Sequence, residues 1–333
     1  MLNIALLGCG RIGKMHAATI ARSPTAQLVS VYDPVFEASE QVGTQFGCAV
    51  APSAEVAIAS ADAVLIATST PTHADLIEAS VRAGKAVFCE KPIDLSLERV
   101  MKCRNAIAAH SSVVQIGFNR RFDPGHRAAR EAVRNGDIGD LQQIIITSRD
   151  PGLAPWGYLQ ASGGIFRDMT IHDFDLARFM LDEEVDEVFA TGSALIEPRL
   201  ATELNDVDSV MVVMRTGSGK LCHINNSRLA TYGYDQRIEL FGSKGMVISD
   251  NRRAHELKRF GAVTTAAGEP YLNFFIERYV EAFSAGLESF IEKAVSGGKP
   301  EATFDDGERA LALAEAAVLS LKKKRFVKVS EVS

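Results

Sequence analysis

The chain has 333 residues and a formal net charge of −6, and 47% of its residues are hydrophobic and 23% charged. This length allows two domains, and the composition is typical of a globular protein that buries a sizeable core. The negative charge argues against nucleic acid as the main partner, and no apolar stretch approaches the length of a membrane span.

The cysteines and the N-terminus indicate a cellular compartment. The five cysteines are scattered and form no zinc-binding spacing, so we expect reduced thiols rather than disulfides. The N-terminus lacks the basic, apolar and small-residue layout of a signal peptide. We therefore expect a cytoplasmic protein with no membrane contact.

The first predicted elements are a strand, a glycine-rich turn and a helix. Residues 2–7 (LNIALL) are typical of a buried parallel strand, and residues 13–22 have helical composition. The turn at residues 8–13 reads GCGRIG and matches the pattern G-x-G-x-x-G. A second strand follows and ends at Asp33, 20 residues after Gly13.

This layout predicts a dinucleotide-binding turn. Gly8 permits the tight turn, Gly10 lets the backbone approach a pyrophosphate, and Gly13 lets the helix pack on the strand. The helix N-terminus suits phosphates, and Asp33 can accept hydrogen bonds from ribose hydroxyls. Because Asp33 would repel a 2′-phosphate, the sequence favours NAD over NADP, although Arg11 could still reach such a phosphate. A glycine-rich corner without a ligand is the alternative.

Helix and strand patterns then alternate as far as residue 122. Helices are predicted at 35–47, 53–60, 71–83 and 96–110, and strands at 48–51, 61–70, 85–92 and 111–122. This alternation predicts a doubly wound parallel sheet that binds ligands beyond the C-terminal ends of its strands. The polar residues at those ends are therefore candidates for ligand contacts: Ser69, Thr70, His73, Glu90, Lys91, Asn119 and Arg120.

The pattern changes in the second half of the chain. Strands are predicted at 141–150, 186–196, 207–215, 220–228, 236–241 and 246–250, and helices at 168–182, 271–297 and 303–323. Residues 253–270 have weak periodicity and are expected to form a mobile strand or loop. Strands joined by hairpin turns predict an α+β domain with a large, mostly antiparallel open sheet. We expect two domains, at residues 1–120 and 121–333.

Residues 162–175 (SGGIFRDMTIHDFD) contain two titratable groups at helical spacing. Asp168 lies in the first turn of the predicted helix, and His172 follows four residues later on the same face. A carboxylate there is stabilised as the anion and can orient the imidazole as a general base. The alternative is a surface pair worth a few tenths of a kcal/mol. No third ligand stands at helical spacing, so no metal site is expected.

Other candidates are a lysine and two tyrosines. Lys91 ends a buried strand, where it could donate to a substrate hydroxyl or simply be exposed to solvent. Tyr232 and Tyr234 could hydrogen-bond a polyhydroxylated ligand or simply pack. The histidines outside these motifs, His16 among them, are expected to be structural or solvent-facing.

Together these motifs resemble the glucose–fructose oxidoreductase / inositol dehydrogenase / rhizopine-catabolism family. The resemblance rests on GCGRIG, ATSTPTH, CEKP, GFNRRFDP, GGIFRDMTIHDFD and YGYDQRIELFGSKG, and it covers nearly the whole chain. GFNRRFDP and YGYDQR are more similar to the inositol 2-dehydrogenase branch. The resemblance implies a Rossmann domain that binds NAD, and a C-terminal domain whose open sheet serves oligomer contacts, commonly in tetramers.

The resemblance also implies roles for individual residues. It implies that Lys91, Asp168 and His172 are catalytic, with His172 as the general base. The cofactor contacts expected from the motif and the strand ends are Gly8, Gly10, Arg11, Ile12, Gly13, Asp33, Ser69, Thr70, His73, Glu90 and Lys91. The implied substrate contacts are Asn119, Arg120, Trp156, Asp168, His172, Tyr232 and Tyr234.

The reaction implied by the resemblance is the NAD-dependent oxidation of a cyclic polyol. Myo-inositol, giving 2-keto-myo-inositol, is the substrate that the inositol branch implies. Three alternatives stay open: another inositol isomer, an aldose sugar, and a sensor of the same fold that binds NAD without turnover.

Overall fold

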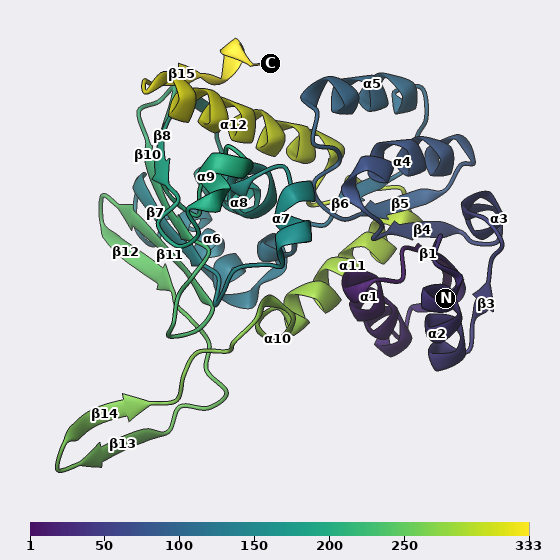
Figure 1. The fold of residues 1–333 in the computed structure, drawn as a ribbon, viewed down its shortest axis with the longest axis horizontal. Helices are drawn as coiled ribbons and strands as arrows, with labels where there is room; N and C mark the ends of the chain where they lie inside the picture. The colour runs from purple at the N-terminus through teal and green to yellow at the C-terminus, as the bar shows by residue number, and fades with distance from the viewer. Residues whose placement is uncertain (333) are drawn as a thin grey trace. The chain divides into compact units, whose positions relative to one another are not determined.

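The computed structural model describes residues 1–332, which divide into two compact units. The first consists of Met1–Phe122 with Glu281–Leu311, and the second of Asp123–Val280 with Ala312–Ser333. Figure 1 shows the elements of both units along the chain. The segment 281–311 therefore lies in the first unit, although the division expected from the sequence places it in the second domain.

The first unit contains a six-stranded sheet with the order β3-β2-β1-β4-β5-β6. Its strands are β1 (Leu2–Leu7), β2 (Ala26–Tyr32), β3 (Ala49–Val50), β4 (Ala63–Ile66), β5 (Ala86–Cys89) and β6 (Val114–Ile116). All pairings in this sheet are parallel. The order reverses beside β1, as in doubly wound sheets that bind dinucleotides. This confirms the predicted Rossmann fold.

Helices join the strands of this sheet. They are α1 (Arg11–Arg22), α2 (Phe36–Phe46), α3 (Ala54–Ala59), α4 (His73–Arg82) and α5 (Leu97–Ile107), with short 3-10 turns η1 (Thr70–Thr72) and η2 (Asn119–Phe122). A later helix, α11 (Val280–Ser296), adds Leu287, Phe290 and Ile291 to the core that contains Ile4 and Leu6. Because burial of these side chains is favourable, this segment packs with the sheet.

The predicted strand at 111–122 is wrong beyond residue 116. Strand β6 has only three residues, and the 3-10 turn η2 holds Asn119 and Arg120. A tight turn follows the strand, and in it the N–H of Phe118 donates to the carbonyl of Ile116 at 2.8 Å. Gly117 permits the close approach there, since a Cβ at this position would lie 2.9 Å from the Glu90 carboxylate.

The second unit contains a seven-stranded sheet with the order β12-β11-β7-β10-β9-β8-β15. Its strands are β7 (Leu141–Arg149), β8 (Val185–Ser193), β9 (Ser209–Thr216), β10 (Leu221–Ser227), β11 (Asp235–Gly242), β12 (Gly245–Ser249) and β15 (Val327–Lys328). Only the β10–β7 pair in this sheet is parallel; the other pairs are antiparallel. The predicted α+β domain with a mostly antiparallel sheet is confirmed.

Helices cover one face of this sheet, whose strands alternate buried and exposed residues. Helices α6 (Pro124–Arg134) and α8 (Ile171–Leu181) contact the sheet. The other helical elements are α7 (Trp156–Ala161), the π-helical turn η3 (Phe166–Thr170), α9 (Arg199–Glu203), α10 (Phe275–Arg278), the 3-10 turn η4 (Val329–Glu331) and α12 (Phe304–Lys323), whose residues up to Leu311 belong to the first unit. The opposite face is open, and apolar side chains such as Ile145 and Met211 are exposed on it.

In the region 253–297, one prediction differs from the structure and the other agrees with it in part. The predicted helix at 271–297 is broken at Tyr279, where the backbone leaves the helical conformation between α10 and α11. Residues 253–270, expected as a mobile strand or loop, include an exposed hairpin of β13 (Lys258–Gly261) and β14 (Thr264–Gly268). Figure 1 shows this hairpin reaching away from the large sheet. Its periodicity is weak because neither face is buried.

No helix within residues 1–332 combines the length and the apolarity that a membrane crossing needs.

Candidate functional site

The glycine turn has the geometry that its predicted roles require. Gly8 has a φ of +96°, and a Cβ there would lie 2.5 Å from the carbonyl of Ala67. A Cβ on Gly13 would lie 1.9 Å from the carbonyl oxygen of Gly8. Only glycine at this position therefore allows helix α1 to pack so close to the strand. A Cβ on Gly10 would meet nothing within 4 Å. The backbone at Gly10 therefore faces open space that a pyrophosphate can use.

Asp33 follows β2 and is tied to this turn. Its Oδ2 accepts a hydrogen bond from the N–H of Cys9 at 2.7 Å, and its Oδ1 accepts one from the N–H of Val35 at 2.9 Å. Burial, with the nearby Asp33 charge, raises the pKa of the Cys9 thiol to about 12. The thiol therefore stays neutral at physiological pH and adds no negative charge beside the predicted phosphate site.

The loops after β4 and β5 are held together by His73. Its ring lies between two carbonyl oxygens, with Nδ1 2.8 Å from that of Pro92 and Nε2 3.0 Å from that of Thr68. The ring is buried, and Pro92 directly follows Lys91. His73 thus fixes the loop that carries Lys91 to the loop that carries Ser69 and Thr70.

A buried contact beneath Lys91 was missed at the sequence level. His16 on α1 lies 2.6 Å from Glu90 (Nε2 to Oε1), and its ring is 1% exposed. The ring packs edge-on against Phe88 and Phe283. His16 was expected to be structural or solvent-facing, and the structure shows the structural case: the residue links the helix of the glycine turn to the residue before Lys91.

The first unit brings its predicted residues to one edge of the sheet. The glycine turn with Arg11 and Ile12 follows β1, Asp33 follows β2, and Ser69 with Thr70 follows β4. Glu90 and Lys91 follow β5, and Asn119 with Arg120 follows β6. Because all six strands are parallel, their C-terminal ends share this edge, which is where doubly wound sheets bind ligands.

In the second unit, Asp168 lies on a π-helical turn rather than in the first turn of an α-helix. The π-helical turn spans Phe166–Thr170, and α8 begins only at Ile171. The predicted helix at 168–182 is thus corrected at its start, and the α-helical argument for the Asp168–His172 spacing does not hold in this turn. Such turns occur frequently at functional sites.

The Asp168 carboxylate is held from two sides. The hydroxyl of Tyr158 donates to Oδ1 at 2.6 Å, and Nη1 of Arg228 donates to Oδ2 at 2.9 Å. The side chain of Arg228 is 2% exposed and that of Asp168 is 11% exposed. This arrangement favours Asp168 as an anion, because one of its partners is a buried guanidinium.

His172 differs from the rest of its helix. Of the eleven residues of α8, all of which the structure describes, His172 is the only one that is not buried. A helix buried on all sides has to find partners for its polar groups. Asn226 provides one of them: its side-chain N–H donates to Asp173 at 2.8 Å, and its Oδ1 accepts from the hydroxyl of Thr170 at 2.7 Å.

The remaining predicted substrate residues lie in different environments. Trp156 begins α7, and the guanidinium of Arg199 lies over its ring at 4.5 Å. Tyr234 is buried and packs edge-on against Tyr279. Tyr232 is half-exposed, and its hydroxyl donates to Asp235 at 2.6 Å and accepts from Arg149 at 2.7 Å.

Tyr232 and Asp168 are associated with opposite faces of the large sheet. Arg149 and Asn225 share the open face with Tyr232, whereas Asn226 points to the face that α8 covers. The hydroxyl of Tyr158 does contact the Asp168 carboxylate, and the sequence did not predict this contact.

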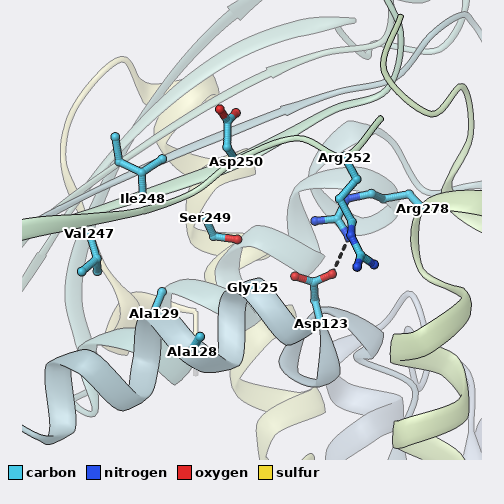
Figure 2. A pocket seen from close by; sticks show the side chains of 10 residues that line it. All are labelled: Asp123, Gly125, Ala128, Ala129, Val247, Ile248, Ser249, Asp250, Arg252 and Arg278. Atoms are coloured by element: carbon cyan, nitrogen blue, oxygen red, sulfur yellow. Dashed lines mark hydrogen bonds and ion pairs between the residues drawn. The ribbon is translucent and has the colours of Figure 1, made fainter. Parts of the chain in front are cut away.

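A cavity of about 450 Å³ in the second unit contains none of the predicted residues. Figure 2 shows its lining by α6, the end of β12 and Arg278. Asp123 caps α6 and forms a buried ion pair with Arg278. Burial raises the pKa of Asp123, but His126 and Arg278 outweigh it and hold the pKa below its ordinary value. The pair stabilises the entry to α6.

The two units therefore supply different chemical groups. The first offers a glycine turn, an acidic residue and a lysine along one sheet edge. The second offers a partly exposed imidazole and a carboxylate held as an anion. The groups of the first unit suit a dinucleotide and the polarisation of an alcohol, and those of the second unit suit the acceptance of a proton. Among the described residues, no cluster of three or more His, Cys, Asp or Glu side chains suits a metal ion.

Comparisons with known proteins identify the family of the chain. Residues 2–118 match the family model described as "Oxidoreductase family, NAD-binding Rossmann fold", and residues 126–248 match the "GFO/IDH/MocA C-terminal domain". The chain is 47% identical to the inositol 2-dehydrogenase of Rhizobium meliloti, and 42% identical to the myo-inositol 2-dehydrogenase of Thermotoga maritima. Each alignment covers 99% of both chains. A solved myo-inositol dehydrogenase from Corynebacterium glutamicum is 44% identical, with a TM-score of 0.95 and 98% of each chain covered.

Proposed function

Since the chain belongs to the GFO/IDH/MocA family of oxidoreductases with an NAD-binding Rossmann fold, we propose that it oxidises a cyclic polyol with NAD. Myo-inositol is the proposed substrate and 2-keto-myo-inositol the product. One observation carries this choice: relatives that are 47% and 42% identical over 99% of the chain are inositol 2-dehydrogenases. The proposal gives Lys91 the role of donor to the alcohol and the imidazole of His172 the role of base.

The residues of the first unit fit NAD. The open space at Gly10 admits the pyrophosphate, and the N-terminus of α1 offers it N–H groups and a favourable dipole. The Asp33 carboxylate, already oriented by two backbone N–H groups, has lone pairs left for the ribose hydroxyls. Bound NAD supplies the hydride acceptor for the reaction.

The protein's own residues handle the proton and the charge. We assign His172 as the general base that takes the hydroxyl proton, while the hydrogen on the same carbon leaves as hydride and the alcohol becomes a ketone. Lys91 donates a hydrogen bond to the reacting oxygen and stabilises its developing charge. Asp168 keeps the imidazole oriented and favours its protonated form after transfer. The substrate contacts assigned to the other residues are Asn119, Arg120 and Tyr234, with Trp156 in support. The expected contact from Tyr232 is withdrawn, because this residue shares the open face of the sheet with Arg149.

A polyol panel tests the reaction. The protein is incubated with NAD and, separately, with myo-inositol, scyllo-inositol, other inositol isomers, glucose and other aldoses, and absorbance is followed at about 340 nm. We expect NADH to form fastest with myo-inositol. NADH formation with aldoses alone would make the chain a sugar dehydrogenase. Tight NAD binding without NADH from any polyol would make it a sensor and would contradict the proposal.

We also propose that the protein forms a homotetramer through the open face of its large sheet. Side chains on this face are apolar and exposed, including Ile145, Met211, Val213 and Phe241. An exposed apolar patch of this kind is typical of a protein interface. Light scattering after size exclusion tests this: we expect four copies for the wild type and smaller species for Met211→Glu. A monomeric wild type would contradict it.

A cytoplasmic location is proposed on the basis of the thiols. All five cysteines are free, and four of them are buried. Such a set suits a reducing compartment. Cell fractionation with an antibody against the chain tests this, and recovery with secreted or periplasmic proteins would contradict it.

A further inference from the structure

Arg228 is the most deeply buried cation near the candidate site. Its side chain is 2% exposed, and within the described part of the chain only its Nη1 has a hydrogen-bond partner, Asp168. Its Nε and Nη2 are buried and donate to no protein group among residues 1–332. A buried guanidinium is costly unless it is paired, so the single pairing of Arg228 with Asp168 carries much of the compensation for its burial.

The strand places Arg228 under the π-helical turn. Side chains on one face of a strand recur every second residue, so Cys222, Ile224, Asn226 and Arg228 follow one another along the covered face of β10 and its extension. Asn226 binds Thr170 at the end of the turn, and Arg228 binds Asp168 at its middle. Two consecutive positions of one strand face thus hold the segment that carries the carboxylate.

A second carboxylate holds the other end of the same turn. Oδ1 of Asp206 accepts a hydrogen bond from the N–H of Ile165 at 3.0 Å. Gly164, with a φ of +88°, approaches this carboxylate so closely that a Cβ would lie 3.0 Å from Oδ1. Burial lowers the pKa of Arg228, but the charges of Asp168, Asp206 and Asp150 outweigh it and raise the pKa above its ordinary value. Arg228 therefore stays charged and lies among carboxylates, of which Asp168 belongs to the turn and Asp206 holds its start.

We propose that Arg228 is a positioning residue of the reaction: it holds Asp168 as an oriented anion, and Asp168 in turn holds His172 as the general base. This inference rests on the proposed dehydrogenase function. It goes beyond that function because it assigns a role to a residue outside the implied catalytic set. Tyr158 completes the arrangement by donating to the second oxygen of the same carboxylate.

The charge of Arg228 predicts a specific pH effect. The groups that we describe around Asp168 are the guanidinium of Arg228 and the phenol of Tyr158, and the charges of Asp206 and Asp150 act on Arg228. The proposed reaction places Asp168 beside His172. Removing the guanidinium leaves the negative charge of Asp168 less compensated, and this favours the protonated form of His172. The acidic limb of kcat/KM therefore moves to higher pH.

The variants Arg228→Gln and Arg228→Lys test this, with Arg167→Met as the matched control. Arg167 precedes Asp168 on the same turn but pairs with Glu315. For Arg228→Gln we expect the acidic limb for myo-inositol oxidation to move up by about one pH unit, with NADH affinity unchanged within about threefold. Arg228→Lys retains the charge, so its acidic limb should stay at the wild-type position. The acidic limb of Arg167→Met should also stay there.

The proposal would be overturned if Arg228→Gln lowered the melting temperature but left the acidic limb of kcat/KM in place. A residue with a structural role alone would give that result. An equal movement of the limb in Arg228→Lys would also overturn the proposal. If Arg228→Gln does not fold, the double variant Asp168→Asn/Arg228→Gln decides between the two outcomes: restored folding supports the pair, and continued failure to fold overturns it.

A second measurement needs no substrate and so separates this proposal from the proposed function. Urea unfolding of Asp168→Asn, Arg228→Gln and the double variant forms a double-mutant cycle. We expect the double variant to be more stable than the sum of the single effects, because each single change leaves a buried charge unpaired. Additive effects would overturn the pairing. A wild type without turnover on any polyol would refute the proposed function, whereas the pairing of Arg228 with Asp168 would still stand or fall with this cycle.

Discussion

The proposed reaction depends most on His172 and Lys91. His172 is the only side chain of α8 that is not buried, so the helix offers one titratable group to solvent or ligand. Lys91 lies in a loop that His73 and the His16–Glu90 contact hold on both sides. Both side chains are therefore presented by rigid surroundings, which is what positioning for proton and charge transfer requires.

Alanine at either position should remove catalysis and spare the cofactor. We expect Lys91→Ala and His172→Ala each to lower kcat by at least about 100-fold, because each removes a group that acts in the transition state. NADH affinity, measured by fluorescence titration, should stay within about threefold of the wild type. Near-normal turnover in both variants would refute the assignment.

Asp33 should control the choice between the two dinucleotides. Asp33→Ala removes both the acceptor for the ribose hydroxyls and the charge that repels a 2′-phosphate. We expect NAD to bind more weakly by about tenfold or more, and the preference for NAD over NADP to shrink. Calorimetric titration with both cofactors measures this, and unchanged affinities for the two would rule out the role.

At the scale of elements, the glycine turn separates the needs of the fold from those of the ligand. A Cβ on Gly13 would collide with the Gly8 carbonyl, whereas one on Gly10 would meet no protein atom. We expect Gly13→Ala to lower the melting temperature by several degrees, because the strand and helix must move apart. Gly10→Ala should leave the melting temperature unchanged and weaken NADH binding. Equal effects of the two variants on stability would contradict this account of the turn.

The sheets and most helices could be predicted from periodicity, and irregular turns could not. The alternation of strand and helix up to residue 122 predicts the parallel sheet, because each element there follows its own pattern. The two irregular turns depend on tertiary contacts. Glu90 closely approaches Gly117 before the 3-10 turn at Asn119, and Arg228 and Asp206 form hydrogen bonds with the segment of the π-helical turn at Asp168. Local sequence carries little trace of such contacts.

Residues of the candidate site could likewise be predicted only where they belong to a sequence motif. The glycine turn, Lys91 and the Asp168–His172 pair stand in recognisable patterns, whereas Arg228 and Tyr158 do not. One signal for Arg228 was present: CHINNSR alternates as a strand and continues the apolar face of Cys222 and Ile224 with Asn226 and Arg228. A polar residue on such a face has to find a buried partner.

At the scale of the whole molecule, neither unit contains the full set of proposed residues, so we expect the proposed activity to need the intact chain. The second unit depends on buried charges as well as on its sheet. Asp123 caps α6 and pairs with Arg278, and both side chains are 2% exposed. Breaking a buried pair by removing one partner leaves an uncompensated charge, which is strongly destabilising.

Asp123→Asn should therefore lower the free energy of unfolding at pH 7 by about 3 kcal/mol or more. The pKa of Asp123 is below its ordinary value in the folded protein, so its contribution is present above the ordinary pKa of about 4 and is lost as the pH falls through the lowered value. Urea unfolding at pH 7 and below pH 4 measures this, and the difference from the wild type should shrink in acid.

Asp182→Asn is the matched control for this change. Asp182 also pairs with an arginine, Arg130, but its side chain is 76% exposed. Asparagine tolerates its left-handed backbone, so we expect a change of less than about 0.5 kcal/mol. Equal losses in the two variants would show that burial is not the source of the effect.

The most direct test of hydride transfer to NAD uses myo-inositol that carries deuterium on the carbon oxidised to the ketone. The wild-type protein is incubated with this substrate and NAD, and the reduced cofactor is analysed by mass spectrometry. We predict NADH that is heavier by the one deuterium, because the hydrogen on that carbon moves directly to the nicotinamide while the hydroxyl proton goes to the protein. Unlabelled NADH, or no reduced cofactor at all, would contradict the proposed reaction.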